Sequence, residues 1–554
     1  MHERVTRSSR RRALWLGVSV MAVVAVAGCS STVPSSQSTA AGQPAVVAVP
    51  AQPPTLDPAF LPDISTAAVD RQIFETLTQP ASGSSGVAPL LATSWTANAN
   101  STAWTFQLRQ GVAFQDGTPF NAAAVCANFD RWYNFTGVLQ SPALLKFWNY
   151  LNGGFANSTT PGLFKSCVAN SSSSVTINLN SPFAPFPITM SSEAFAIASP
   201  AALTKYKADS VSTTSSTPEF LGTFGTKNPV GTGPYELKSW TQGSQILLTA
   251  NASYWGGKPK TQLVAFKFIS DPTAARQALQ AGDINAYINT SPADVSALKS
   301  AGFNIITIPP FNVSYLGMNQ KMDNLSNLDL RQAIAYALDR KAVVDSQYAP
   351  GSTVADQFQP PSIFGYSKSV RQYPYDPAKA RQLIAASGIP HPTLDFWYPT
   401  GVSQAALPNP SAMFQAFQAN LQAVGFTVVA HAAPWTPDYL QAVNQGEAGI
   451  YLLDWNADFA DPDNFLGSFF GRPLPRFGID NPTLRAQIAA AEAEPDQAQR
   501  TTMYQQINQE LMQLLPGVPI AYAPSLAATS PNLTGFNVGP LGVGSLADMT
   551  LAGK

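Results

Sequence analysis

The residues whose types and spacing suggest chemistry most directly lie in the segment 452–466, LLDWNADFADPDNFL. Asp458 follows Trp455 by three positions, and Asp461 and Asp463 flank a proline shortly afterwards. A carboxylate is the natural partner of an ammonium group, because a buried ammonium must be paired and hydrogen-bonded to avoid a large desolvation cost. Asp461 and Asp463 are typical of a turn that caps the next helix. For Asp458 the residues alone leave both roles open.

The chain has few residues that could form a catalytic or metal-binding site. Its 554 residues include three histidines and three cysteines, too few for most zinc or iron–sulfur sites. His391 lies between two prolines and His431 ends a β-rich run, and neither has a nucleophile motif nearby. No sequence motif indicates the pair of catalytic carboxylates that glycosidases use. We expect no catalytic residues, no metal site and no cofactor.

The composition is that of a globular protein with few charges. Hydrophobic residues make up 45% of the chain and charged residues 12%, where about 25% charged is typical. The net charge is −1, and basic residues cluster only within the first dozen positions, so nucleic-acid binding is excluded. A length of 554 residues suggests three or four structural units of about 150 residues.

The N-terminus is typical of an export signal. Five arginines between residues 4 and 12 precede an apolar run, Ala13–Ala27, which is shorter than the roughly 20 residues that span a bilayer as a helix. The following Gly28-Cys29 completes a sequence, VAGC, that resembles the bacterial lipobox. We expect a signal peptide at 1–28, a lipid anchor on Cys29 and a flexible tether at 29–44, with a chance cysteine beside an ordinary cleavage site as the alternative.

Two further cysteines, Cys126 and Cys167, remain in the exported chain. In an oxidising compartment they can form a disulfide bond that closes a loop of about 40 residues. Two buried thiols without a bond are the alternative.

Several segments share one pattern, in which a capped helix ends at a glycine and a β-rich run follows. The helices are expected to begin at Asp271-Pro272, at Asp376-Pro377 and at Phe414, and to end at Gly282, Gly388 and Gly425. Strands are expected at 284–288 and 427–430. This alternation favours parallel strands covered by helices, whereas the runs 104–108 and 245–250 are typical of antiparallel strands.

A further helix is expected from Asn327, in NLDLRQAIAYALDRKAVVD. Its apolar residues recur on one face, so Arg331, Asp339 and Arg340 are expected on or near the solvated side.

An ordered series of motifs resembles the extracellular solute-binding proteins of peptide-type ABC transporters, solute-binding family 5. The resemblance covers nearly the whole exported chain. Its motifs are PTLDP from Pro54, PLLATSWTAN from Pro89, WTFQLRQGVAFQDGTPFNAAAVCANF from Trp104, GTGPY from Gly231 and WNADFADP from Trp455.

The resemblance implies an α/β, two-lobed, periplasmic-binding-protein-like fold of type II that bends at a hinge and carries an inserted subdomain. The first lobe would comprise 45–78, 195–308 and 517–554, with the inserted subdomain at 79–194 and the second lobe at 309–516. The chain would cross the hinge near Pro309-Pro310 and again near Pro516.

The resemblance also implies the site. Trp455 would form an aromatic wall of the cleft, and Asp458 would pair with the α-ammonium group of a bound peptide. Gly231, Thr232 and Gly233 would let another chain approach closely.

The implied function is a monomeric, lipid-anchored, extracytoplasmic protein that captures short peptides and delivers them to the permease subunits of an ABC importer. Peptide length and the residue that pairs with the ligand carboxylate stay open. One alternative keeps the fold and binds haem, a nickel complex or an oligosaccharide. The other is a non-transporting lipoprotein that regulates the cell envelope.

Overall fold

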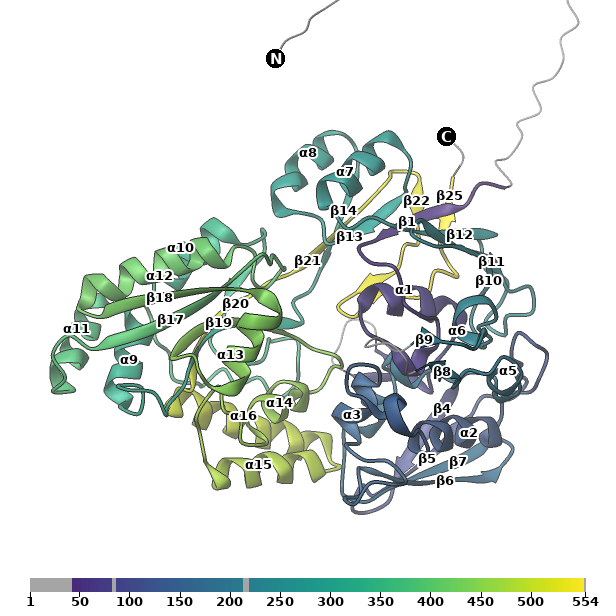
Figure 1. Cartoon of the computed structure of the whole chain (residues 1–554), viewed down its shortest axis with the longest axis horizontal. Coiled ribbons are helices and arrows are strands. Elements are labelled where there is room, and N and C mark those ends of the chain that lie inside the picture. The colour runs from purple at the N-terminus through teal and green to yellow at the C-terminus, as the bar shows by residue number, and fades with distance from the viewer. Residues whose placement is uncertain (1–41, 82–85, 213–218, 553–554) are drawn as a thin grey trace, which may run out of the picture. The chain divides into compact units, whose positions relative to one another are not determined.

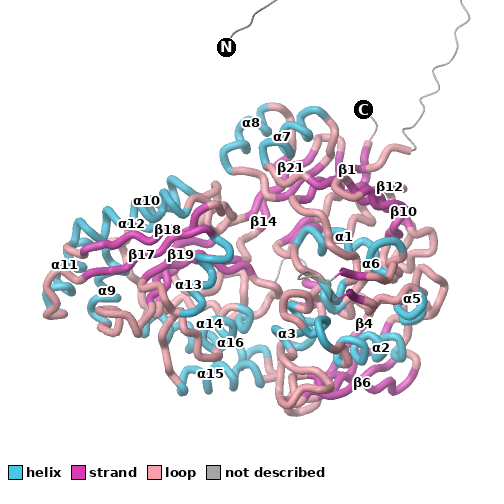
Figure 2. The backbone as a smooth tube through the Cα atoms, viewed as in Figure 1, coloured by secondary structure: helices cyan, strands magenta, loops and turns pink. Residues whose placement is uncertain are grey.

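The computed structural model describes residues 42–81, 86–212 and 219–552. Cys29, the expected signal peptide and most of the expected tether lie outside the described residues. No helix in the described part is long and apolar enough to cross a membrane. The described chain folds into three main β-sheets with helices packed around them (Figures 1 and 2).

The first sheet has seven strands and mixes parallel and antiparallel pairs. Its central strand β1 runs parallel to both neighbours, β12 and β13, while the outer pairs are antiparallel. In spatial order the strands are β10 (Tyr235–Thr241), β11 (Gln245–Ala250), β12 (Leu263–Phe268), β1 (Ala45–Val49), β13 (Ala286–Ile288), β21 (Ser525–Thr529) and β14 (Asn304–Ile308). The accompanying helices are α1 (Ile64–Ile73), α5 (Pro200–Lys205), α6 (Phe224–Lys227), α7 (Pro272–Ala281) and α8 (Val295–Ser300).

The second sheet has six strands and its own hydrophobic core. Strands β17, β18 and β19 are parallel, and the other pairs are antiparallel. The spatial order is β16 (Thr353–Val354), β20 (Gly517–Tyr522), β15 (Asn312–Met318), β19 (Ile450–Asn456), β17 (Thr393–Thr400) and β18 (Thr427–Pro434). Its helices are α9 (Leu328–Ala337), α10 (Arg340–Gln347), α11 (Pro377–Ala386), α12 (Pro410–Val424), α13 (Leu440–Gln445), α14 (Leu466–Phe470), α15 (Pro482–Ala493) and α16 (Gln497–Leu514).

The third sheet lies in the segment predicted as an insert and is antiparallel throughout. Its order is β4 (Ala92–Ala97), β5 (Ala103–Leu108), β7 (Ser174–Leu179) and β6 (Phe164–Ser171). Helices α2 (Ala122–Tyr133), α3 (Lys146–Leu151) and α4 (Phe186–Thr189) belong to the same segment. The segment packs around a core rich in aromatic side chains, and this core also includes Phe60, Leu61 and Leu77 from the preceding part of the chain.

The chain passes between the first two sheets at two neighbouring places. It leaves β14 for β15 across residues 309–311 and returns from β20 to β21 across residues 523 and 524. The Asn312 amide ties the two crossings together, donating to the Ala523 carbonyl at 2.9 Å and accepting from the Ala523 N–H at 3.0 Å. The predicted return to the first lobe at residue 517 is wrong, because β20 is fully buried and pairs with β15 and β16 in the second sheet. We propose a boundary after Tyr522.

The capping residues behave largely as predicted. The Asp271 carboxylate accepts from the Ala274 N–H at 2.7 Å at the start of α7, and Gly282 ends that helix at φ 80°. The predicted strands 104–108 and 245–250 are antiparallel. The helix predicted from Phe414 begins earlier, at Pro410, because the Asn409 side chain caps its first turn.

The prediction for Arg331 and Arg340 is wrong, since both side chains are buried. Arg331 is 4% exposed and donates to the carbonyls of Leu325, Ser326, Leu514 and Leu515. Arg340 is 8% exposed and donates to the carbonyls of Ala355, Tyr373 and Pro519. Amphipathic spacing missed them because each guanidinium also satisfies carbonyls that are distant in sequence, at the end of α16 for Arg331 and on β20 for Arg340.

Glu75, just beyond the end of α1, is a buried residue whose side chain joins three segments of the chain. Its carboxylate accepts from Thr232 Oγ1 at 2.7 Å, Tyr254 Oη at 2.8 Å and Trp255 Nε1 at 2.7 Å. Burial raises the pKa of Glu75 to about 7, against the opposing effect of these hydrogen bonds. The network fixes the end of α1 relative to the GTGPY segment.

The substitution Glu75→Gln should reduce the pH dependence of stability. Because the pKa of Glu75 rises from 4.5 to about 7 on folding, the native state holds this proton more tightly, and the associated stability is lost as pH rises through 7. At about 1.4 kcal/mol per pKa unit, the wild-type loss between pH 4.5 and 8 is about 3 kcal/mol. Denaturant unfolding of the wild type and of Glu75→Gln across this pH range measures the difference. If the free energy of unfolding changed equally with pH in both proteins, the prediction would be contradicted.

Cys126 on α2 and Cys167 on β6 form a disulfide bond with a sequence separation of 41 residues. The double variant Cys126→Ser/Cys167→Ser should lose about 4 kcal/mol of unfolding free energy, because the open chain gains the entropy of a loop of this length. Denaturant unfolding with and without a reducing agent checks this. The reductant should destabilise the wild type and leave the double variant unchanged, and a wild type that ignores it would refute the expectation.

Candidate functional site

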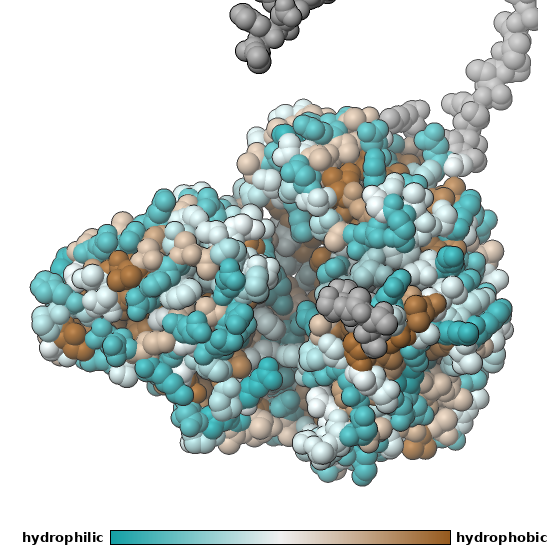
Figure 3. Space-filling view, in the orientation of Figure 1, coloured by the Kyte–Doolittle hydropathy of each residue, from teal (hydrophilic) through white to brown (hydrophobic). Residues whose placement is uncertain are grey.

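A cavity of about 870 Å³ lies between the seven-stranded and six-stranded sheets. On one side it is lined by the ends of β1 and β13, the segment after β12, and residues of α1 and α3. On the other it is lined by residues 403–405 and 456–458, which follow β17 and end β19, and the crossing residue Pro524 lies at its edge. Figure 3 shows the surface hollowed between these two parts of the molecule.

The strand directions explain why a cavity forms here. Strands β1, β12 and β13 are parallel, so their carboxyl ends meet at one edge of the first sheet. Strands β17 and β19 are parallel in the second sheet and present their carboxyl ends to the same cavity. Ligands of open α/β sheets bind outside the carboxyl ends of the strands. The cavity is therefore the candidate binding site.

Asp458 lies on this cavity, two residues beyond the end of β19, where its side chain is partly exposed. The Asn464 side chain fixes its backbone, because Asn464 Oδ1 accepts from the Asp458 N–H at 2.9 Å. Burial raises the pKa of Asp458 above its ordinary value, while the charge of Lys146 and the Asn464 side chain act in the opposite direction. A carboxylate in this setting gains from a further cation, since a charge partner offsets its desolvation.

Trp455 was predicted to line the cavity, but in the structure its side chain packs elsewhere. Its indole packs edge-on against Phe469 with ring centroids 5.5 Å apart, and its Nε1 donates to Asn464 Oδ1 at 3.3 Å. The residues that line the cavity in the described structure include 456–458 and not Trp455. Trp455 and the backbone of Asp458 both donate to the Asn464 side chain. Trp455 therefore helps to position Asn464, which in turn positions Asp458.

Gly231, Thr232 and Gly233 also lie away from the cavity, which corrects their prediction as ligand-binding residues. A Cβ atom on Gly231 would come within 2.2 Å of the Ile73 carbonyl oxygen, and one on Gly233 within 2.6 Å of the Gln72 carbonyl oxygen. The close approach expected for these glycines therefore takes place within the protein, against the end of α1. Thr232 is fully buried and bonds to Glu75.

Sequence reasoning missed three residues of the site. Asn464 is fully buried and positions Asp458, and Arg71 and Lys146 supply positive charge to the cavity lining. Asn464 lies two residues beyond the WNADFADP motif, where nothing in the sequence marks it as a site residue. Arg71 and Lys146 lie on α1 and α3 in segments with no pattern that sets them apart from other surface charges.

The site is suited to binding a molecule with charged groups. Acidic and basic side chains face a partly apolar space, with Leu61, Ile64 and Phe147 among its lining residues. Among the described residues, no group of three or more His, Cys, Asp or Glu side chains is placed to hold a metal ion.

Comparisons with known proteins agree with this geometry. The family model described as bacterial extracellular solute-binding proteins, family 5 Middle, matches residues 86–473. Heme-binding protein A of Haemophilus influenzae is 28% identical over 504 residues, which cover 88% of this chain and 88% of that protein. The dipeptide-binding protein of Escherichia coli is 28% identical over 477 residues, which cover 83% of this chain and 85% of that protein.

A solved structure is similar across the same extent. It is the ABC transporter-associated periplasmic binding protein DppA from Helicobacter pylori in complex with the peptide STSA, with a TM-score of 0.71 and 24% identity over 92% of this chain and 98% of that chain. The expected type II periplasmic-binding-protein fold is confirmed. Members of this family are extracytoplasmic binding proteins of transport systems, not enzymes. With a family model matched over more than half its length, the chain belongs to the bacterial extracellular solute-binding proteins of family 5.

Proposed function

We propose that the protein captures short peptides in the cavity and delivers them to the permease of an ABC importer. The observation that carries this proposal is the placement of Asp458 on the cavity wall, held by Asn464 and kept from water on most sides. In this proposal the Asp458 carboxylate binds the α-ammonium group of the peptide. A dipeptide-binding relative and a peptide-bound structure of the same fold support it.

The lining of the cavity also suits a peptide main chain. Strand ends of both sheets border it, so an extended peptide bound there would lie beside the protein backbone on both sides. Main-chain pairing gives affinity without selecting side chains, and a volume of about 870 Å³ leaves room for several of them. Contacts to both sides of the cavity would favour a closed form over an open one.

The lining favours a peptide over haem, which one relative is named for. Haem iron is held by His, Cys, Met or Tyr side chains. The residues that line the cavity in the described structure include no His, Cys or Met, and the hydroxyl of their one tyrosine, Tyr287, is buried. The same shortage of ligands argues against a nickel complex held directly by the protein.

The substitution Asp458→Ala should weaken binding of trialanine by about 2 to 5 kcal/mol, roughly 30-fold to several-thousand-fold in Kd, because the peptide ammonium loses its charge partner. Isothermal titration calorimetry measures this effect. Asp323→Ala is the matched control, since Asp323 is exposed and does not line the cavity. Equal trialanine affinity in wild type and Asp458→Ala would refute the assignment.

We also propose that Cys29 carries the lipid that anchors the protein outside the cytoplasm, with residues 29–44 as tether. In cells of a lipoprotein-producing bacterium, the wild type should partition into the detergent phase of a Triton X-114 extract and Cys29→Ser into the aqueous phase, because the acyl chains are lost. The control Cys126→Ser/Cys167→Ser should stay in the detergent phase. A Cys29→Ser protein that partitions as the wild type does would contradict the anchor.

A further inference from the structure

The predicted insert contacts the part of the chain that forms the six-stranded sheet, through segments other than the two crossings. Tyr150 on α3 and Ser468 on α14 share a hydrogen bond between their hydroxyl groups. The Ala184 N–H donates to the Glu492 carbonyl on α15 at 2.8 Å. Ile188 of the insert is buried in the core of the six-stranded sheet. We call these five residues the insert contact.

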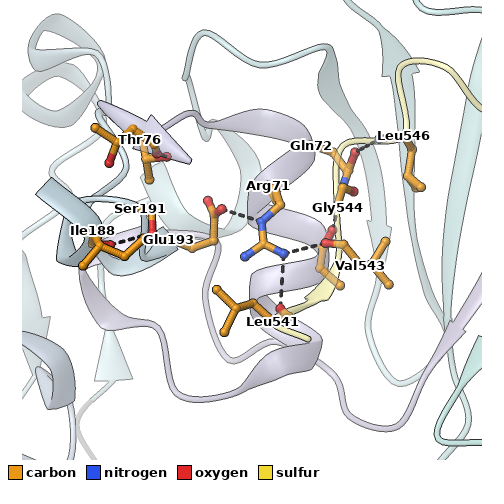
Figure 4. Close-up of polar contacts among 12 residues, drawn as sticks. Arg71, Gln72, Thr76, Ile188, Ser191, Glu193, Leu541, Val543, Gly544 and Leu546 are labelled. Carbon is orange, nitrogen blue, oxygen red and sulfur yellow. Dashed lines mark hydrogen bonds and ion pairs between the residues drawn. The ribbon is translucent and has the colours of Figure 1, made fainter. Parts of the chain in front are cut away.

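The insert contact is linked to both sides of the cavity. Ser191 Oγ donates to the Ile188 carbonyl at 2.6 Å, and Glu193, two residues later, accepts from Arg71 Nε on α1 at 2.5 Å (Figure 4). Residues of α1 and α3 line one side of the cavity and residues 456–458 line the other. Because the contact joins α3 to the elements that follow residues 456–458, it favours the closed form of the cavity.

The carboxylates of Asp463 and Glu492, which we call the carboxylate pair, have no basic partner of their own. Arg500 on α16 is bonded elsewhere, because its Nη1 and Nη2 donate to the two oxygens of Asp461 at 2.7 and 2.8 Å. Its Nε donates to the Ala491 carbonyl at 2.9 Å. Among the described residues, no basic side chain forms an ion pair with either member of the pair. Asp463 Oδ1 is buried without a hydrogen-bond partner.

Asp463 lies directly behind the insert contact. A Cβ atom on Gly467, the neighbour of Ser468, would collide with Asp463 Oδ1. Asp463 also precedes Asn464, whose side chain holds the backbone of Asp458 at the cavity. The carboxylate pair therefore adjoins the insert contact and the residue that positions the cavity carboxylate.

The surroundings of the carboxylate pair disfavour its full ionisation. The charged or titratable groups that face it are Asp461 before the 3₁₀ helix Pro462–Asn464, Arg500 and Tyr504 on α16, and Tyr150 on α3. Helix α14 and the stretch 184–188 carry no titratable side chain. Burial raises the pKa of Asp463 well above its ordinary value, and the charge of Glu492 adds to this effect. Burial also raises the pKa of Glu492, to about 7.

We propose that the carboxylate pair is a proton-operated switch of the insert contact. Loss of the proton leaves three negative charges, on Asp461, Asp463 and Glu492, against the single positive charge of Arg500. Opening of the contact lets water reach the pair and stabilise these charges, so ionisation favours the open contact. Since the closed contact raises the pKa of the pair, the contact is stable below pH 7 and weakens as the pH rises through that value. The switch goes beyond the proposed function and depends on no particular ligand.

Hydrogen exchange of the ligand-free protein between pH 6 and 9 tests this proposal, because the Ala184 N–H exchanges when the insert contact opens. Comparing proteins at the same pH cancels the intrinsic exchange rate. The wild type should lose protection at Ala184 with rising pH by at least about 10-fold relative to Glu492→Gln, the effect of one pKa unit. Pro182, Pro185 and Pro187 have no amide proton, which simplifies the peptic fragments around Ala184. An equal loss of protection in both proteins would overturn the proposal.

Two control variants should keep the pH dependence of the wild type. Glu494→Gln is the matched control, because Glu494 lies just beyond the end of α15 and its side chain accepts from the Asp496 N–H at 2.8 Å. Glu75→Gln removes another carboxyl group whose pKa is about 7, but Glu75 lies outside the insert contact. Loss of the pH dependence in either control would overturn the assignment to the carboxylate pair.

A further variant keeps the test decisive if Glu492→Gln fails to fold. Asp463→Asn removes the other charge of the pair and nearly preserves the size of the side chain. Its protection at Ala184 should fall with pH at least about 10-fold less than that of the wild type. An Asp463→Asn protein that loses protection as the wild type does would overturn the switch.

The failure of this inference differs from failure of the proposed function. Stopped-flow dissociation of trialanine should be slower at pH 6 than at pH 9 in the wild type, and the difference should be smaller in Glu492→Gln. Dissociation rates that change equally with pH in both proteins would overturn the effect of the switch on the cavity. A wild type that binds no trialanine would overturn the peptide function, while exchange at Ala184 would still decide the switch.

Discussion

The buried carboxylate of Glu75 is the interaction on which the first side of the site depends. Three hydrogen bonds from Thr232, Tyr254 and Trp255 meet on it, and it lies just beyond the helix that carries Arg71. A buried acceptor of this kind specifies one arrangement of its donors, because any other leaves polar groups unpaired. The position of α1, and with it the Arg71 guanidinium at the cavity, depends on a network that lies outside the cavity lining.

Much of the fold could be predicted because its signals are local. Asp271 and Gly282 bracket α7 through hydrogen bonds and a backbone conformation that involve only neighbouring residues, and period-two alternation identified β5 and β11. The buried arginines could not be predicted in the same way. Arg331 and Arg340 bond to carbonyls up to 184 residues away in sequence, and no local pattern encodes such partners.

Only the side of the site that Asp458 contributes could be predicted from the sequence. Asp458 lies on the cavity because it follows the end of a parallel strand, a position that motif and strand order both indicate. Gly231 and Gly233 have the small size that a close approach requires, but the partner is the end of α1 and not a ligand. A glycine in the sequence indicates that another group approaches the backbone closely, but it does not indicate which group that is. Arg71 could be placed only once the chain from Leu541 to Val543 was seen to lie beside it.

The paired crossings at Asn312 and Ala523 have a mechanical consequence. Both connections are two or three residues long, and the side chain of Asn312, directly after the first connection, is hydrogen-bonded to Ala523 in the second. A relative motion of the two halves would therefore be a rotation about this point and not a slide. Under such rotation, displacement grows with distance from the pivot, as it does along a lever. A ligand that contacts both sides of the cavity far from Pro524 therefore needs the least force to set the angle between the two halves. A ligand bound close to Pro524 exerts little torque on that angle.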